Sequence, residues 1–115
     1  MSIPFFVVLL VVIAGGVMTI FRLRPDIKGE GARKLVACGA RLLDVRSPAE
    51  FASGHLPGAI NIPVDAIERR ITELEPRERA IVLYCASGAR SAQAKRVLAA
   101  KGFTTLHNLG PMSAW

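Results

Sequence analysis

The chain has few cysteines and few aromatic residues, and these shortages exclude several classes of protein. Its 115 residues include two cysteines, one tryptophan and one tyrosine. Cys38 and Cys85 are too few for the disulfide framework of a small secreted domain. No C-x-x-C or H-x-x-x-H pattern occurs, so we expect no structural metal site. The net charge is +6, but the basic residues lack interleaved aromatic side chains for base stacking, which argues against nucleic-acid binding.

Charge is absent from residues 3–21, "IPFFVVLLVVIAGGVMTIF". A helix of this length is roughly 28 Å long, close to the hydrocarbon thickness of a bilayer. We therefore predict a transmembrane helix over residues 3–21, with the lipid bilayer as one partner and a membrane protein as another candidate. A cleaved secretory signal is the alternative, although no basic residue precedes the apolar run and "AGG" is a poor cleavage site.

Basic residues crowd the carboxyl flank of this apolar segment. They are Arg22, Arg24, Lys28, Arg33 and Lys34. Because basic residues near a membrane span tend to stay in the cytoplasm, this asymmetry predicts a single-pass membrane protein whose folded domain is cytoplasmic. Signal cleavage would instead make the domain periplasmic or secreted.

Residues 22–30 combine a proline, a glycine and mixed charge, as is typical of a linker, and we expect the folded domain over residues 31–115. Within the domain, apolar runs of strand length alternate with helical patterns. The strand-like runs cover 41–46, 59–63, 80–85 and 104–109, and the helical patterns cover 31–37, 64–74 and 89–102. This alternation predicts an α/β domain with a mainly parallel central sheet flanked by helices.

The segment "YCASGARS", residues 84–91, places Cys85 at the end of a buried strand and Arg90 near the start of a helix. Ligands in such folds sit at the carboxyl ends of strands and the amino ends of helices. Free N–H groups of the intervening loop, curled at Gly88, and the cation of Arg90 are expected to stabilise a Cys85 thiolate and an incoming oxyanion. The alternative interpretation is a buried structural cysteine followed by a solvated arginine.

Three separated motifs resemble the rhodanese family of sulfurtransferases. They are "LLDVRSPAEFASGHLPGAINIP", "VLYCASGARS" and "LHNLGPMSAW", and the resemblance covers residues 31–115. It implies a small rhodanese-like α/β domain in which Cys85 carries sulfane sulfur as a persulfide and no cofactor is required. The substrate-binding loop that it implies comprises Ala86, Ser87, Gly88, Ala89 and Arg90.

Related phosphatases of the same fold have a longer loop, C-x5-R, which wraps a phosphate. Here four residues separate Cys85 from Arg90, and Tyr84 stands where such phosphatases usually have histidine. Both differences favour sulfur over phosphate. Many active family members have a basic residue directly after the cysteine, whereas this chain has Ala86. The expected donor is thus either the small anion thiosulfate or another persulfide, and the expected acceptor is a thiophile such as cyanide or a thiol.

Other motif residues are expected to support the site. Asp44 ends a strand beside it and is predicted to form an ion pair or hydrogen bonds with Arg46 or the backbone, in preference to a direct catalytic role. Ser47, Pro48 and Glu50 are predicted to start a helix through a capping box.

Two further residues and one further function complete the expectations. His55 is expected to fix its loop by a hydrogen bond, and Cys38 to pack as a small hydrophobic residue. The alternative to an enzyme is a non-catalytic regulatory or partner-binding module at the membrane, which uses the same loop to hold an anion or a partner. The two functions differ at Cys85, since only the enzyme needs its sulfur atom.

Overall fold

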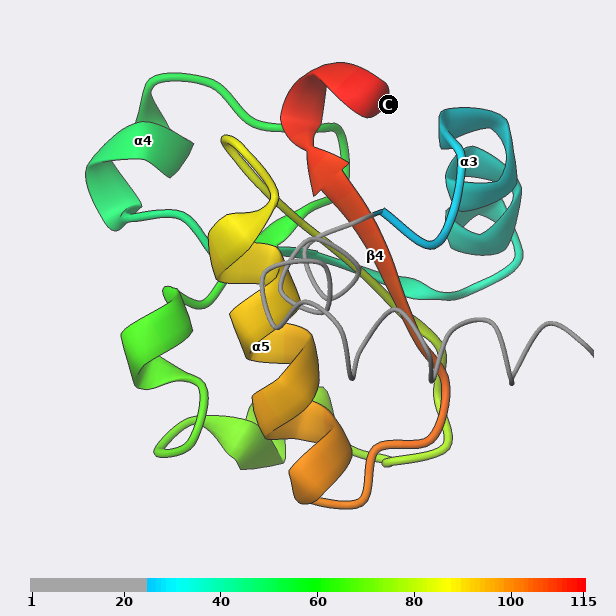
Figure 1. Cartoon of the computed structure of the whole chain (residues 1–115), viewed down its shortest axis with the longest axis vertical. Helices are drawn as coiled ribbons and strands as arrows, with labels where there is room; N and C mark the ends of the chain where they lie inside the picture. Colours follow the sequence, from blue (N-terminus) through cyan, green and yellow to red (C-terminus); the bar gives the residue numbers. More distant parts are fainter. Residues whose placement is uncertain (1–24) are drawn as a thin grey trace, which may run out of the picture.

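The computed structural model describes residues 25–115, which form a sheet covered by helices on both faces (Figure 1). The transmembrane helix predicted over residues 3–21 lies outside the described residues. Between residues 25 and 115, none of the helices is both long and apolar enough to cross a membrane.

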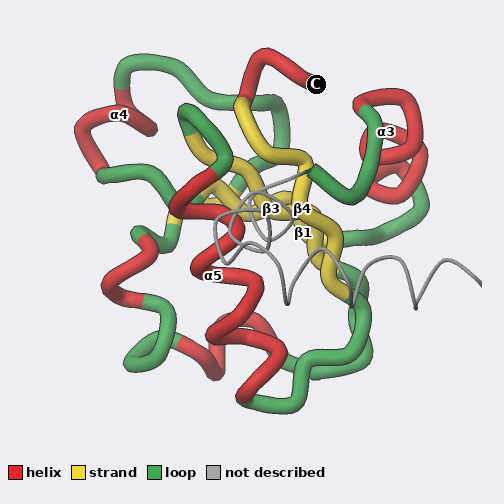
Figure 2. The backbone as a smooth tube through the Cα atoms, in the orientation of Figure 1, coloured by secondary structure: helices red, strands yellow, loops and turns green. Residues whose placement is uncertain are grey.

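The central sheet has four strands, and every neighbouring pair is parallel. In spatial order these are β2 (Ile60–Asn61), β1 (Arg41–Asp44), β3 (Ile81–Cys85) and β4 (Leu106–Pro111). The predicted parallel α/β architecture is therefore confirmed, and Figure 2 shows the strands side by side. Because all strands run in the same direction, their carboxyl ends meet at one edge of the sheet, where Cys85 ends β3.

Between residues 25 and 115, three α-helices and three short 3₁₀ helices connect and cover the strands. The α-helices are α3 (Gly29–Ala37), α4 (Pro48–Ala52) and α5 (Ala89–Ala100), and the 3₁₀ helices are η1 (Val64–Ala66), η2 (Ile71–Leu74) and η3 (Met112–Ala114). The helical patterns around α3 and α5 are confirmed, and α3 begins two residues before the predicted start of the domain.

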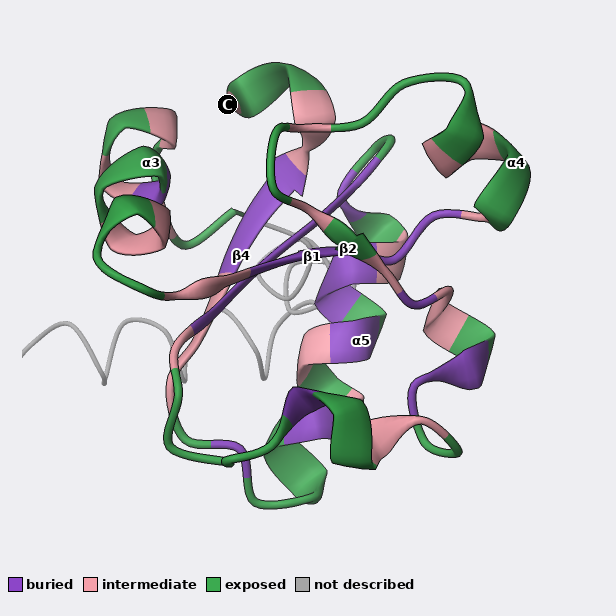
Figure 3. Cartoon of the chain, turned by 180° about the vertical axis from the view of Figure 1, so that it is seen from behind, coloured by how far each residue is buried: buried purple, intermediate pink, exposed green. Residues whose placement is uncertain are grey.

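The sheet divides the apolar interior into two clusters. Side chains along β3 alternate between its faces, as expected for a strand. Leu83 and Cys85 pack against α5, η1 and η2, whereas Val82 and Tyr84 pack against α3 and the end of β4. Figure 3 shows the buried residues concentrated in the central strands and on the inner side of α5. The prediction of a central strand buried on both faces is confirmed, because all five residues of β3 are buried.

The continuous surface helix predicted over residues 64–74 is wrong. The chain forms η1 and η2 with turns between them, and Arg70 leaves the helical region at φ −111° and ψ 19°. β-Branched residues such as Val64, Ile67 and Ile71 lower helix propensity, so packing determines the backbone here. The apolar spacing was still informative, since Ile67 is fully buried in the core.

Three smaller expectations also need correction. The second strand is shorter than predicted, with only Ile60–Asn61 in β2, and the last strand is displaced toward the carboxyl terminus as Leu106–Pro111. Cys38 is exposed and does not pack as a core residue. It occupies the carboxyl cap of α3, just before the turn at Gly39, where the chain leaves the helix.

Candidate active site

Cys85 is positioned by the most buried strand of the sheet. It is the last residue of β3 and has no exposed surface. Its side chain lies on the face covered by α5, together with Leu83 and Leu98. The sulfur therefore lies beneath the first turn of the helix that follows it.

The turn between β3 and α5 brings a backbone donor onto the sulfur. Gly88 precedes the first residue of α5 and has φ +101°, a conformation that favours glycine because it lacks a Cβ atom. No side chain caps this helix start. The N–H group of Gly88 instead donates a hydrogen bond to Sγ of Cys85, with an N–S distance of 2.9 Å.

Ser91 is the second group beside the sulfur, and its role was not predicted from the sequence. Its hydroxyl oxygen lies 3.5 Å from Sγ of Cys85 and 3.1 Å from the carbonyl oxygen of Gly88, to which it donates. Ser91 is itself completely buried. A hydroxyl in the first turn of α5, six residues after the cysteine, was the available signal. Since a hydroxyl rotates, it can accept from the thiol or donate to a thiolate.

These contacts favour the charged form of the sulfur. Burial raises the pKa of the Cys85 thiol, but hydrogen bonds from the Ser91 hydroxyl and from the N–H groups of Ser91, Gly88 and Ser87 outweigh burial and lower the pKa below its ordinary value. A lowered thiol pKa increases the fraction of nucleophilic thiolate at neutral pH.

Arg90 binds a carboxylate from another element. Its Nη1 and Nη2 atoms lie 2.7 and 3.0 Å from the two carboxylate oxygens of Glu50, which is forty residues earlier in the chain. Arg90 hydrogen bonds lower the pKa of Glu50 to about 2, and a hydrogen bond from the backbone of Ser47 contributes. From the sequence, Arg90 is expected to stabilise the Cys85 thiolate, and its pair with Glu50 was not predicted. The two side chains of this pair are about one third exposed.

Glu50 also completes the predicted capping box of α4. The hydroxyl oxygen of Ser47 accepts from the Glu50 N–H, and a carboxylate oxygen of Glu50 accepts from the Ser47 N–H. The capping prediction is thus confirmed. One carboxylate therefore ties the start of α4 to the start of α5.

The predicted Asp44–Arg46 ion pair is present and buried. Nε and Nη2 of Arg46 donate to the carboxylate of Asp44 at 2.7–3.1 Å, and its backbone N–H donates to the same group at 2.9 Å. Nη2 also donates to the carbonyl of Gly54. This pair fixes the loop after β1.

Two neighbours complete that loop. His55 Nδ1 lies 2.9 Å from the Phe51 carbonyl oxygen, in agreement with its predicted role in fixing the loop. The hydroxyl of Tyr84 accepts from the Leu56 N–H at 3.1 Å. Burial raises the pKa of Tyr84 to about 12, so its hydroxyl remains protonated at neutral pH.

The remaining loop residues form an exposed rim. Ala86, Ser87 and Ala89 are exposed, whereas Gly88 is buried. Between residues 25 and 115, no group of three or more His, Cys, Asp or Glu side chains could hold a metal ion.

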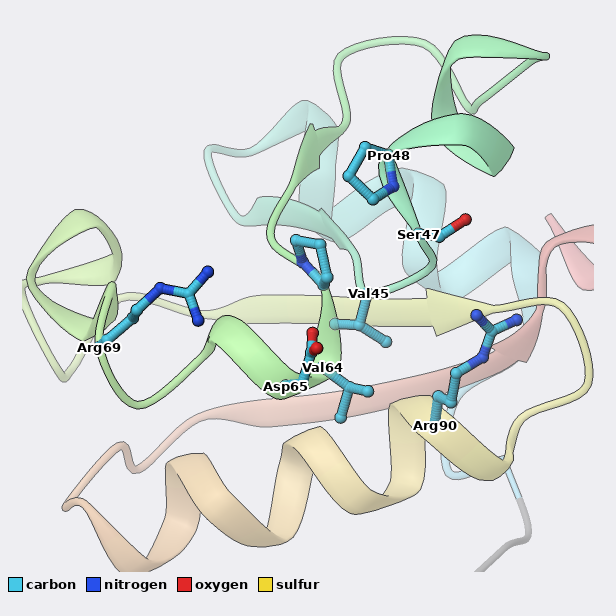
Figure 4. Close-up of a pocket in the computed structure, with 8 residues that line it drawn as sticks. Val45, Ser47, Pro48, Val64, Asp65, Arg69 and Arg90 are labelled. Carbon is cyan, nitrogen blue, oxygen red and sulfur yellow. The ribbon is translucent and has the colours of Figure 1, made fainter.

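A pocket of about 520 Å³ adjoins the cysteine loop at Arg90. It opens between the loop after β1, the start of η1 and the start of α5 (Figure 4). Its lining consists of Val45, Ser47, Pro48, Pro63, Val64, Asp65, Arg69 and Arg90. Chemically, the site joins a sulfur nucleophile, a backbone N–H that donates to it, a hydroxyl that can rotate to donate to its thiolate, and an adjacent cavity for a second molecule.

Known proteins with similar sequences include enzymes that transfer sulfur. The chain is 44% identical over 75 residues to a sulfurtransferase of Allochromatium vinosum, covering 64% of this chain and 69% of that protein. It is 38% identical over 69 residues to the thiosulfate sulfurtransferase PspE of Escherichia coli, covering 59% of this chain and 66% of that protein. The alignments thus span about two thirds of these relatives.

A solved structure supports the same relationship. The human single-domain sulfurtransferase superposes with a TM-score of 0.67 at 32% identity, covering 80% of this chain and 92% of that one. The predicted enzyme class, a sulfurtransferase, is confirmed by these relatives. Residues 29–115 also match the model of the rhodanese-like domain. Because this match covers most of the sequence, the chain belongs to the rhodanese-like domain family.

Proposed function

We propose that Cys85 carries sulfane sulfur as a persulfide between a donor and a thiophilic acceptor. The observation that supports this role most directly is the convergence of the Gly88 N–H and the Ser91 hydroxyl on the buried sulfur of Cys85. A purely structural cysteine would not need two polar groups that favour its charged form.

In the first step, the thiolate of Cys85 attacks the outer sulfur of the donor. With thiosulfate, a new S–S bond forms to Cys85, the bond between the two sulfur atoms of thiosulfate breaks, and sulfite leaves with the electron pair. With a persulfide donor, the leaving group is the donor's thiolate. Charge balances in both cases, so the step requires neither a cofactor nor an external oxidant.

In the second step, the acceptor attacks the outer sulfur of the Cys85 persulfide. Cyanide leaves as thiocyanate, and a thiolate leaves as a new persulfide. The S–S bond to Cys85 breaks, and its electron pair returns to Sγ as the thiolate. The donors at Gly88 and Ser91 then stabilise the leaving group, because a thiolate held at low pKa leaves faster.

The chain is further proposed to act at a membrane, with this domain in the cytoplasm. The support is the uncharged run over residues 3–21 and the basic residues on its carboxyl flank. Exposed Cys38 provides a reporter, since buried Cys85 is a poor target for bulky reagents. A membrane-impermeant thiol reagent should label Cys38 only after cell lysis. Labelling in intact cells would place the domain outside.

Mass spectrometry of the full chain tests the sulfur-carrying role. After incubation with thiosulfate or an alkyl persulfide, Cys85 should gain about 32 Da, the mass of one sulfur atom, in a modification that a reducing thiol removes. Cys85→Ser should lose both this adduct and sulfur transfer to cyanide while keeping its circular dichroism spectrum. Cys38→Ser is the matched control and should keep both. Sulfur transfer by Cys85→Ser would refute the proposal. A chain that gains no sulfur from any donor would favour the non-catalytic binding module.

A further inference from the structure

Arg90 supplies the positive charge of the loop that follows the catalytic sulfur. Residues 86–89 carry no charge, and Arg90 is the second residue of α5. Hydrogen bonds to Glu50 are the main cause that raises the pKa of Arg90, and the negative charges of Glu50 and of Cys85 add to this rise. The guanidinium is therefore close enough to the sulfur to act on an anionic donor that approaches it.

Glu50 already binds this cation. Hydrogen bonds of 2.7 and 3.0 Å join Nη1 and Nη2 of Arg90 to the two carboxylate oxygens of Glu50. In this paired geometry, arginine binds carboxylates and other oxyanions. The sulfonate oxygens of thiosulfate require the same donors. A thiosulfate ion must therefore compete with Glu50 for Arg90, and the carboxylate of Glu50 also repels it.

The carboxylate of Glu50 is also held by its own helix. Its Oε1 atom accepts from the Ser47 N–H at 3.0 Å, within the capping box of α4. Figure 4 shows Arg90 extending from the start of α5 toward the segment that carries Ser47. Hydrogen bonds from Arg90 and from the Ser47 backbone lower the pKa of Glu50 to about 2, so the group is ionised at neutral pH. Glu50 is thus a fixed negative charge beside the cation of the loop.

We propose that Glu50 determines donor specificity by neutralising Arg90, and that the site selects organic sulfane donors with fewer negative charges than thiosulfate. Arg46, whose charge also acts on Arg90, is likewise neutralised, by Asp44. The inference deepens the proposed function and rests on it. With either class of donor, the Cys85 thiolate attacks the outer sulfur and a new S–S bond forms to Cys85. The donor's own bond to that sulfur breaks, and the leaving group takes the electron pair.

The test compares two donors that differ in charge, with the full chain as the enzyme, cyanide as the acceptor and thiocyanate as the measured product. Thiosulfate carries two negative charges. Methanethiosulfonate carries one, and it delivers its outer sulfur in the same way with methanesulfinate as the leaving group. The donor ratio is defined as kcat/KM for methanethiosulfonate divided by kcat/KM for thiosulfate.

Glu50→Gln should lower the donor ratio. It frees Arg90 for an incoming anion while keeping an oxygen for the Ser47 N–H. Because the doubly charged donor gains more from a free cation, the ratio should fall about threefold to tenfold, the range expected for partly exposed charged contacts. The fall should appear mainly as a lower KM for thiosulfate.

Glu73→Gln is the matched control. Glu73 accepts two hydrogen bonds of 2.7 and 2.9 Å from Arg70 in another partly exposed pair, and Arg70 does not line the pocket beside Arg90. This substitution removes the same charge from the chain, and the donor ratio should stay unchanged. In a second comparison, Arg90→Ala is added to Glu50→Gln. The double variant should lose the fall in donor ratio, because the freed cation is no longer present.

The inference and the proposed function fail in distinguishable ways. A donor ratio that Glu50→Gln leaves unchanged, in a chain that still forms thiocyanate, would refute the specificity role and leave the proposed function intact. A fall that Glu73→Gln reproduces, or that persists in the double variant, would refute it as well, since neither depends on the Glu50–Arg90 pair. A wild-type chain that forms thiocyanate from neither donor would refute the proposed function and the inference together.

Discussion

The two helices that begin at the carboxyl edge of the sheet satisfy their first N–H groups in opposite ways. At α4, the side chain of Ser47 accepts from the N–H of Glu50, and Glu50 returns a hydrogen bond to Ser47. At α5, no side chain caps the helix, and the N–H of Gly88 donates to the sulfur of Cys85. The start of α4 is capped by side chains of its own residues, whereas at the start of α5 the free N–H of Gly88 binds the sulfur nucleophile.

The difference shows how neighbouring loops on one sheet divide structural and chemical roles. The loop after β1 contains the buried Asp44–Arg46 pair, whose charges neutralise each other. The loop after β3 leads into α5, whose first turn holds Arg90 at the pocket, where Glu50 binds it with about one third of each side chain exposed. The capping box of α4 and the buried ion pair stabilise the fold, whereas the uncapped start of α5 provides N–H donors for negative charge.

The largest effect on stability is expected from breaking the buried Asp44–Arg46 ion pair in the loop after β1. Arg46→Ala leaves the carboxylate of Asp44 buried without its partner, which should lower the free energy of unfolding by about 3–5 kcal/mol. Urea denaturation followed by circular dichroism measures the change. Arg70→Ala removes an exposed pair and should cost much less, because solvent screens exposed charges. Equal losses in the two variants would show that the Asp44–Arg46 pair does not stabilise the fold as described.

The next largest effect is expected from adding a side chain at Gly88, just before the uncapped start of α5. Gly88→Ala should lower stability by about 1–2 kcal/mol, because an L-residue at positive φ is strained. It should also raise the pKa of the Cys85 thiol if the turn relaxes away from the sulfur. The rate of Cys85 alkylation against pH, in a Cys38→Ser background, reports this pKa.

Gly39→Ala is the matched control for that variant. Gly39 has φ +108°, and a Cβ atom there would meet nothing within 4 Å. The control should therefore show the same backbone strain with an unchanged alkylation profile for Cys85. A shifted profile in Gly39→Ala would show that general destabilisation, and not the loss of the Gly88 donor, controls the thiol.

Removing one hydroxyl from each helix start compares the two regions directly. Ser47→Ala should lower the free energy of unfolding by about 1 kcal/mol, the usual cost of losing an N-cap. Ser91→Ala should instead raise the pKa of the Cys85 thiol, since it removes the side-chain donor that lowers it most. Denaturation and alkylation profiles are recorded for both variants. If Ser47→Ala shifted the alkylation profile as much as Ser91→Ala, the division between the two helix starts would be wrong.

The smallest effect is expected from removing the Glu50–Arg90 ion pair, which joins the start of α4 to the start of α5. This effect depends on pH. Arg90 lowers the pKa of folded Glu50 to about 2 from an ordinary value of 4.5. The stabilisation from the pair is thus present above pH 4.5 and is lost as the pH falls through 2. Glu50→Gln keeps an oxygen for the Ser47 N–H but removes the charge. Its thermal midpoint should lie below that of the wild-type chain at pH 7, and the gap should close near pH 2. A gap that does not depend on pH would contradict this account.

Short sequence patterns correctly predicted β3, α5 and the capping box of α4, because each of these depends on residues close together in the chain. The apolar run at residues 80–85 and the alanine-rich segment after Arg90 identified β3 and α5, and the Ser47–Glu50 spacing identified the capping box. Residues 64–74 were mispredicted because their apolar spacing is compatible with 3₁₀ turns that bury the same residues.

The parts of the site that sequence reasoning missed are contacts between distant residues. Glu50 and Arg90 are separated by forty positions, and neither flanking sequence indicates that the other exists. Ser91 was within the quoted motif, but its contact with Cys85 depends on the turn at Gly88 folding the helix start back over the strand. The pocket likewise requires the loop after β1, the segment around η1 and the start of α5 to be placed together in space.

The parallel sheet also affects when during folding the thiol acquires its properties. Each pair of neighbouring strands is joined through a crossover, so pairing must bring together segments far apart along the chain, which slows folding. Strand β3 needs both β1 and β4, and the donors to Cys85 come from the helix between β3 and β4. A newly made chain therefore has an ordinary, mostly protonated cysteine at this position. The Cys85 thiol becomes reactive only when the fold is complete, which limits its premature oxidation and misplaced disulfides during synthesis.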